Sequence, residues 1–201
     1  MYIQKFVKGI AGGASGIGWK EAKAMLLSGG GIYSNWWRGK STITTAEVQQ
    51  ILTMQNLDRH LHDYDNFGHE TPFISLASGC VSRNVLLKRN EIYSAVDTAI
   101  DFATDAFRHE GFLFYGWIVV GLNPAVEIST VAESVRDLNV YHGWSPFQLE
   151  GEITAKVHIP ANQIERVELW GPASASGGCL DRFDNKDYIP PDPIANLREL
   201  F

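Results

Sequence analysis

Residues 144–160 constrain the chain most, because they combine two closely spaced carboxylates with an uninterrupted strand pattern. Between Ile153 and Ile159 apolar residues alternate with polar ones, which is the period of a half-buried strand. Glu150 and Glu152 stand just before this alternation, and in an extended chain residues two apart point to the same side. Paired carboxylates suit a reaction in which one group stabilises a developing cation while the other moves a proton. The alternative is a solvated strand end that carries two glutamates.

This frame resembles the third motif of the Arg-Ser-Glu class of ADP-ribosyltransferases, the class of cholera toxin, heat-labile enterotoxin and pertussis toxin. In that class the Glu-x-Glu is followed by an apolar strand and a short Ile-Pro step, which Ile159 and Pro160 match. The resemblance implies that Glu152 stabilises the oxocarbenium-like transition state as nicotinamide leaves NAD, and that Glu150 deprotonates the acceptor. The two-Glu form goes with an acceptor arginine on a target protein. An alternative Gln-x-Glu pair, Gln148 and Glu150, begins two residues earlier. With that pair, the strand and the Ile-Pro step would be shifted by two residues relative to the motif.

Residues 32–37 have the composition of a strand and end in an aromatic residue followed by Arg38. Thr44 or Thr45 is then a good N-cap for a helix over residues 46–52. The first motif of the class is an aromatic residue and an Arg at the end of the first strand. The resemblance therefore implies that Arg38 holds the phosphates of NAD with its guanidinium fork. The alternative is an exposed Arg at a strand end.

Residues 73–76 are predicted to form a short strand that resembles the first half of the second motif, aromatic-apolar-Ser-Thr-Ser. The Thr-Ser of the motif is replaced here by Leu76 and Ala77. The resemblance implies that Ser75 orients Glu152 by a hydroxyl–carboxylate hydrogen bond. The replacement leaves open which accessory polar contacts surround the nicotinamide.

Two further segments would complete such a site. Residues 54–69 are polar and His-rich but lack metal-ligand spacing, so they predict a surface loop, and no metal is implied. Enterotoxin-like members carry a His just after an Asn-Leu in this region, and His60 resembles it as a residue lining the NAD site. The loop that feeds the two glutamates carries Tyr141, Trp144 and Phe147 with Gln148, which either recognise the target or belong to the core.

The remaining pattern is that of an α+β fold. A helix is predicted over residues 91–110, with strands over residues 112–120 and 165–170. The resemblance implies two packed, mostly antiparallel sheets around an NAD cleft with flanking helices. We expect a catalytic domain over residues 32–170, a linker-like segment with a short helix over residues 1–31, and a flexible, extended tail over residues 171–201.

The glycine-rich run from Gly9 to Gly18 also looks like the phosphate loop of short-chain dehydrogenases, with residues 19–27 as the following helix. That family needs an acidic residue after a second strand and a Tyr followed by Lys four positions on. Tyr93, Tyr115 and Tyr141 are followed at that distance by Asp, Val and Ser. An NAD(P)-dependent oxidoreductase is therefore the least favoured alternative.

Length, net charge and cysteine content limit the kinds of partner and location that the chain can have. The 201 residues suit one domain, and the net charge of −6 argues against duplex DNA held by a broad basic face. A transferase acting on nucleic-acid bases is thus a second hypothesis, and a non-catalytic binding domain is a third. The sequence leaves undecided whether Cys80 and Cys179 form a disulfide. No apolar run is long enough to span a membrane and no signal peptide is visible. The resemblance to the toxin class implies a secreted or delivered effector that acts in a target-cell cytoplasm. Its partners would be the target protein and, in some toxins, a cognate immunity or inhibitor protein.

Overall fold

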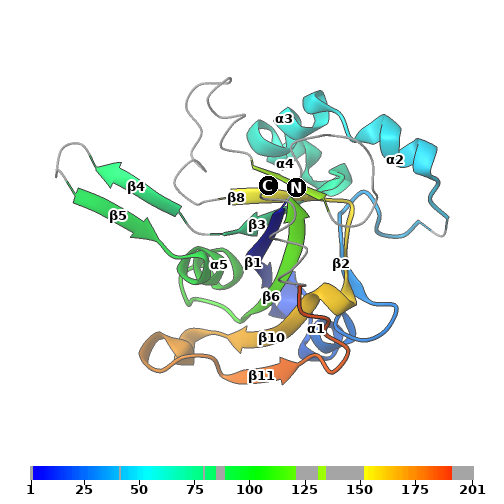
Figure 1. Ribbon diagram of the computed structural model, residues 1–201. Coiled ribbons are helices and arrows are strands. Elements are labelled where there is room, and N and C mark those ends of the chain that lie inside the picture. Colours follow the sequence, from blue (N-terminus) through cyan, green and yellow to red (C-terminus); the bar gives the residue numbers. More distant parts are fainter. Residues whose placement is uncertain are drawn as a thin grey trace.

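A seven-stranded sheet organises the chain, whose computed structural model describes residues 2–40, 42–78, 80–84, 89–120, 131–134 and 152–191 (Figure 1). The strand order is β1-β3-β8-β7-β6-β10-β11, and β1 also pairs with β6. Among the described strands β6 and β7 form the one parallel pair, so the predicted mostly antiparallel α+β fold is confirmed. The strands of this sheet are β1 (Tyr2–Ala11), β3 (Phe73–Ala77), β6 (Gly111–Val120), β7 (Val131–Ser134), β8 (Glu152–Lys156), β10 (Ile164–Trp170) and β11 (Asp181–Asp184).

Two small sheets and several helices complete the fold. β2 (Gly31–Tyr33) pairs with β9 (His158–Pro160), and β4 (Cys80–Asn84) pairs with β5 (Arg89–Tyr93) as a hairpin that projects from the main body in Figure 1. The α-helices are α1 (Trp19–Ala24), α2 (Thr45–Ile51), α3 (Met54–His62), α4 (Tyr64–Phe67) and α5 (Ala95–Thr104). Short 3-10 helices cover Gly13–Ser15, Gly68–Glu70, Ala161–Gln163 and Pro172–Ser176.

The N-terminal segment is a strand of the main sheet, which makes the linker interpretation of residues 1–31 wrong. β1 pairs antiparallel with β6 at ten successive positions, from Tyr2 opposite Val120 to Ala11 opposite Gly111. Both neighbours of β1 run antiparallel to it, whereas a dinucleotide-binding βαβ unit requires a parallel neighbour. The predicted helix after the glycine-rich run exists as α1, although it ends at Ala24.

β1 also closes a ring of strands, but by a single residue pair. It meets β3 only where Val7 lies opposite Ala77, while β3, β8, β7 and β6 are paired in turn. Beyond this contact β1 and β3 separate, because β1 continues along β6 and β3 continues along β8. The sheet is therefore split on one side, and the split determines where a ligand can enter.

Helix α5 lies close against β1 and β6 because glycines face it. A Cβ at Gly9 would come within 2.4 Å of the Ala99 carbonyl oxygen, and one at Gly111 within 2.3 Å of the Ala103 carbonyl oxygen. Only residues without a side chain permit this approach. Val7 and Leu113 then pack beneath the helix with Ala99, Ile100 and Ala103. The predicted helix over residues 91–110 is correct only in its middle, since residues 89–93 form β5.

The second layer covers the other face of the sheet. Ile32 of β2 and Ile159 of β9 join Ile74, Phe114 and Ile153 in the largest apolar cluster. Val157 separates β8 from β9 with a φ of 51°, a backbone conformation that β-branched residues rarely adopt. Its N–H donates to the Pro72 carbonyl and its C=O accepts from Ser34 N–H, at 2.8 Å each. The chain can thus leave β3 and pair with β2 without a break in its hydrogen bonding.

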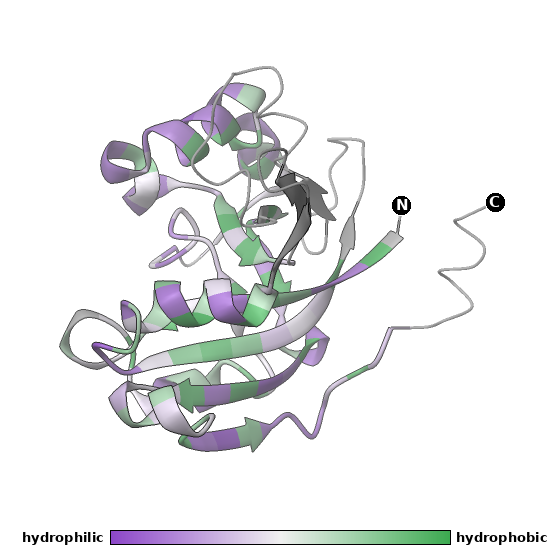
Figure 2. Cartoon of the chain, turned by 90° about the vertical axis from the view of Figure 1, so that its left-hand side faces the viewer, coloured by the Kyte–Doolittle hydropathy of each residue, from purple (hydrophilic) through white to green (hydrophobic). Residues whose placement is uncertain are grey.

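Three further expectations can be compared with the structure: the helix capped by Thr44, the loop over residues 54–69 and the C-terminal tail. The helix capped by Thr44 is confirmed, since its Oγ1 accepts from Glu47 N–H at the start of α2. The surface loop expected at residues 54–69 is wrong, because α3 and α4 form there. The tail expected from residue 171 is wrong in part, because β11 pairs with β10 and belongs to the sheet. Figure 2 shows this edge strand as largely hydrophilic, in keeping with its exposure.

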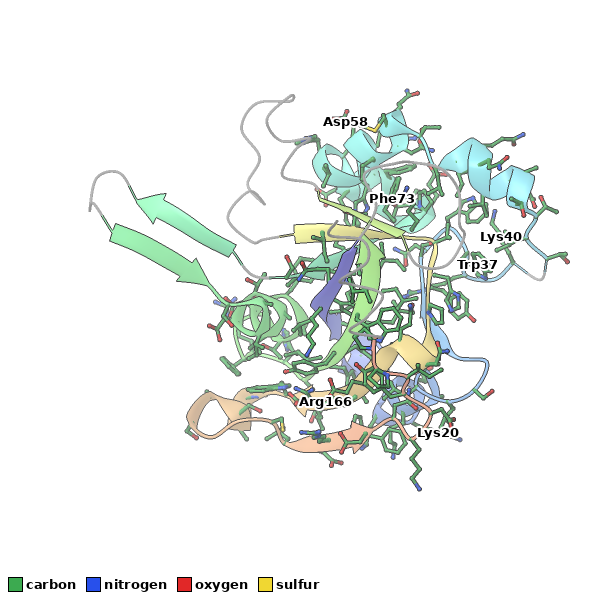
Figure 3. All side chains as sticks on the ribbon, in the orientation of Figure 1. Lys20, Trp37, Lys40, Asp58, Phe73 and Arg166 are labelled. Atoms are coloured by element: carbon green, nitrogen blue, oxygen red, sulfur yellow. The ribbon has the colours of Figure 1, made fainter. Side chains whose placement is uncertain are left out.

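A buried carboxylate ties β10 to β6. Glu168, 6% exposed, accepts hydrogen bonds from Tyr115 Oη at 2.7 Å, Arg166 Nε at 2.8 Å and Trp170 Nε1 at 3.1 Å. The Arg166 guanidinium, labelled in Figure 3, also stacks on the Tyr115 ring at 3.7 Å. Burial and the nearby carboxylate together raise the pKa of Tyr115, so its hydroxyl stays a donor.

We expect Glu168→Ala to destabilise the fold by about 2–4 kcal/mol, because three half-buried donors then lose their buried acceptor. Urea denaturation followed by circular dichroism measures the effect. Glu165→Ala is the matched control, since Glu165 lies on the same strand, contacts Arg166 at 3.2 Å and is more exposed. Equal losses from the two substitutions would show that Glu168 is an ordinary surface carboxylate.

Candidate active site

A cavity of about 770 Å³ lies where β1 and β3 separate. Its walls come from β1, β3, α3, α5 and the segment that begins with β2. The polar side chains on these walls include Lys8, Arg38, His60 and Ser75. Gly16, Ile17 and two residues of α4 line it as well, so the cavity collects residues from six separate parts of the chain, most of them in regular structure.

His60 is aimed at β3 by the helix that carries it. α3 buries Leu57, His60 and Leu61, which are spaced three and four residues apart and so share one helix face. Leu57 and Leu61 pack on Phe73 at the start of β3. Figure 3 labels Phe73 there. Because Leu57 and Leu61 pack on β3, His60 on the same helix face is directed toward that strand as well.

Two hydroxyls hold the His60 ring. Its Nδ1 lies 2.9 Å from Thr71 Oγ1 and its Nε2 lies 2.9 Å from Ser75 Oγ. Burial, followed by the charge of Lys8, lowers the pKa of His60 to about 4. The imidazole is therefore neutral at pH 7, with one ring nitrogen as donor and the other as acceptor.

Strand register brings the Glu-x-Glu segment to the same place. β3 and β8 pair antiparallel, with Ser75 opposite Thr154 and Ala77 opposite Glu152. Ser75 and Ala77 both line the cavity, and residues directly opposite one another in a sheet occupy the same face. Glu152 therefore stands opposite a residue of the cavity wall, two residues along β8 from the partner of Ser75.

The end of β2 forms another wall, and it differs from the expected strand over residues 32–37. β2 stops at Tyr33, and the chain then turns, with the Ser34 carbonyl accepting from the N–H groups of Trp37 and Arg38. Ser34 is 2% exposed and its Oγ has no hydrogen-bond partner, while Arg38 is exposed at the cavity margin. The residue at the strand end is therefore a buried serine, and the arginine follows four positions later.

Aromatic rings support this wall from behind. The Tyr33 ring stacks on His158 of β9 at 4.2 Å, and Trp37 lies 5.9 Å from the same imidazole. Lys40 Nζ sits 3.9 Å from the centre of the Trp36 ring. Figure 3 shows the labelled Trp37 and Lys40 together on the segment that follows β2. Stacking fixes the Tyr33 side of the cavity in the free protein.

The structure brings together three of the residues singled out in the sequence, because Arg38, His60 and Ser75 line one cavity. Glu152 is described through its place in β8. Glu150 and the recognition candidates Tyr141, Trp144, Phe147 and Gln148 lie outside the described residues. Within the described part of the chain no group of three or more His, Cys, Asp and Glu side chains is arranged to hold a metal, and Cys179 is exposed and free.

Sequence reasoning missed three polar residues of this site: Lys8, Ser34 and Thr71. Lys8 belongs to the segment taken for a linker, although its neighbours already had strand composition. Ser34 and Thr71 carry no signal of their own, since a buried serine or threonine is recognised only once its surroundings are known. Both were placed by tertiary contacts.

Comparison with solved structures gives matches at low sequence identity. The chain matches EcPltA with a TM-score of 0.51 and 13% identity, over 94% of this chain and 89% of that one. A heat-labile enterotoxin mutant gives 0.42 and 15% (92% and 75% covered), and the catalytic domain of the mosquitocidal toxin from Bacillus sphaericus gives 0.44 and 12% (97% and 59% covered). No family model and no curated protein matches the chain.

The match to EcPltA shows the fold of the ADP-ribosyltransferase toxins, the fold that the Glu-x-Glu frame predicted. Among the described helices none has both the length and the apolar character needed to cross a bilayer.

The buried neutral His60 makes stability depend on pH in a defined direction. Its pKa is about 4 when folded and near 6.5 when unfolded, so the unfolded chain binds the extra proton between these values. The contribution of His60 to the free energy of unfolding is fully present above pH 6.5. It falls as the pH drops toward 4, by up to about 3 kcal/mol. We expect His60→Gln to flatten the decline between pH 6.5 and 4.5 in urea titrations. His69→Gln, on the exposed Gly68–Glu70 turn, is the control; an unchanged slope in His60→Gln would contradict the assignment.

Proposed function

We propose that the protein is an NAD-dependent mono-ADP-ribosyltransferase that modifies an arginine of a target protein and releases nicotinamide. One observation carries the proposal: Ser75, on the strand next to the Glu-x-Glu strand, lines the cavity and is held by a buried neutral histidine. A surface serine beside an unrelated pair of glutamates would not need such support. The shared toxin fold is consistent with the same chemistry.

Glu152 is the proposed group that stabilises the transition state. As the bond between nicotinamide and ribose lengthens, positive charge develops on the ribose, and a carboxylate beside it lowers the energy of that state. The Ser75 hydroxyl would donate a hydrogen bond to this carboxylate and fix its orientation. Because β3 and β8 are paired at five positions, the two groups are carried on one rigid unit.

His60 and Thr71 set the direction of the Ser75 proton in this mechanism. Thr71 Oγ1 already accepts from Phe73 N–H at 3.2 Å, which leaves its own proton to donate to His60 Nδ1. His60 Nε2 then carries the single imidazole proton and donates to Ser75 Oγ. The Ser75 proton is thereby free for the carboxylate of Glu152.

Glu150 is the proposed base that removes a proton from the attacking guanidinium, which cannot act as a nucleophile while fully protonated. Arg38, at the cavity margin, would contact the phosphates of NAD. Tyr141, Trp144, Phe147 and Gln148 stay predictions for recognition of the target. A cognate immunity protein, if one exists, would act by covering this face.

The test is NAD turnover by the full chain, with nicotinamide release followed over time and agmatine as the arginine analogue. We expect Glu152→Gln to lower the rate of nicotinamide release by about 10²–10³-fold or more, since transition-state stabilisation by a charged group is lost. Glu150→Gln should keep hydrolysis of NAD but lose transfer to agmatine. Glu165→Gln, a carboxylate remote from the cavity wall, is the control for a general charge effect.

Each other outcome has a defined meaning. Wild-type protein that neither binds NAD nor releases nicotinamide contradicts the proposal and leaves a non-catalytic binding domain. Loss of both reactions in Glu150→Gln supports the Gln148–Glu150 register. Turnover of NAD with modification of nucleic-acid bases in place of agmatine would retain the enzyme class and change the acceptor.

A further inference from the structure

We propose that Lys8 of β1 is the principal phosphate-binding cation of this site, in the role that a strand-end arginine has in the Arg-Ser-Glu class. The inference rests on the proposed function, because it names a binding residue for the NAD pyrophosphate. It assigns a binding role to the N-terminal strand, which the three sequence motifs do not include. The argument starts from the residue that occupies the strand end.

Position 34 carries no charge. β2 ends at Tyr33, so the residue that directly follows the strand-end aromatic is Ser34 and not an arginine. The Ser34 side chain lines the cavity with an Oγ that has no partner among the described residues. A hydroxyl can donate one hydrogen bond to a phosphate oxygen, but it cannot balance the two negative charges of a pyrophosphate. A cation has to come from elsewhere.

Lys8 lines the same cavity from β1. Its Nζ lies 5.8 Å from the centre of the Phe102 ring of α5, and both residues line the cavity. Its charge also contributes to the lowered pKa of His60, so the ammonium acts on the interior of the site. Among the described lining residues Lys8 and Arg38 are the cations.

Lys8 is better placed than Arg38 to hold an anion. It is half-buried, whereas Arg38 is exposed, and a charge acts more strongly where water is partly excluded. β1 is paired with β6 along its whole length, and Gly9 lets α5 lie directly against the strand beside Lys8. Arg38 stands on a turn after a three-residue strand. A cation on a rigid element loses less conformational freedom when the ligand binds.

A competing role for Lys8 is support of the catalytic carboxylates, since His60 and Ser75 line the same cavity. The two roles differ in which ligands they affect. A phosphate contact matters only for ligands that carry phosphate, whereas a contact with Glu152 would affect every ligand and the rate of the chemical step. Comparing ligands with and without a pyrophosphate therefore separates them.

The experiment is calorimetric titration of wild type, Lys8→Gln, Lys8→Arg and Lys5→Gln with NAD, ADP, inorganic pyrophosphate and nicotinamide riboside. We expect Lys8→Gln to weaken NAD, ADP and pyrophosphate binding by about tenfold or more, the effect of losing one charge-assisted hydrogen bond. Nicotinamide riboside binding should change less than about twofold. Lys8→Arg should retain most of the affinity. Lys5→Gln, an exposed lysine on the same strand, removes the same charge outside the cavity and should bind like wild type.

Melting temperatures of all four proteins show whether Lys8→Gln is folded. Unchanged NAD and ADP affinity in folded Lys8→Gln overturns the proposal, and so does equal weakening of all ligands, nicotinamide riboside included. If wild type neither turns over nor binds NAD, the proposed function fails by itself. Pyrophosphate then still tests Lys8, and an affinity for it that Lys8→Gln does not reduce overturns the anion site.

Discussion

The unequal pairing of β1 is the constraint on which the rest of the structure depends. The strand is paired with β6 at ten positions but meets β3 at one, where Val7 lies opposite Ala77. This single contact closes the ring of strands, and beyond it the sheet must open. The cavity follows from that opening. A longer β1–β3 ladder would fill the space with backbone hydrogen bonds and leave no room for a ligand.

The polar part of the site is built as a chain of supports. Helix α3 fixes His60 through its leucines, His60 and Thr71 fix each other, and His60 holds Ser75 on β3. Val157 connects the backbone segments of the site in a similar way. Its N–H donates to the Pro72 carbonyl and its C=O accepts from Ser34 N–H, in a strained conformation. Strain of this kind persists only where its surroundings determine it fully, and such places are often functional.

Much of the chemistry was visible in the sequence. The spacing of Glu150 and Glu152, the alternation that follows and the Ile-Pro step indicated a strand with paired carboxylates, and β8 and β9 form there. Ser75 was predicted on a strand, and β3 carries it. The predicted surface loop over residues 54–69 failed because its polar sequence is typical of a loop. Only the packing of Leu57 and Leu61 on Phe73 shows that one face of α3 is buried.

The sequence by itself determined the local elements and the motif residues, since side-chain period and capping act over a few neighbouring residues. Only the tertiary structure decided that the N-terminal segment is a central strand, that β2 stops at Tyr33 and that Lys8 shares a cavity with Ser34. These features depend on which distant strands pair, and a pairing between residues 7 and 77 leaves no mark on either segment alone. The physical reason is that β-sheet contacts join residues far apart in the chain, so their register is chosen by the packing of the whole domain.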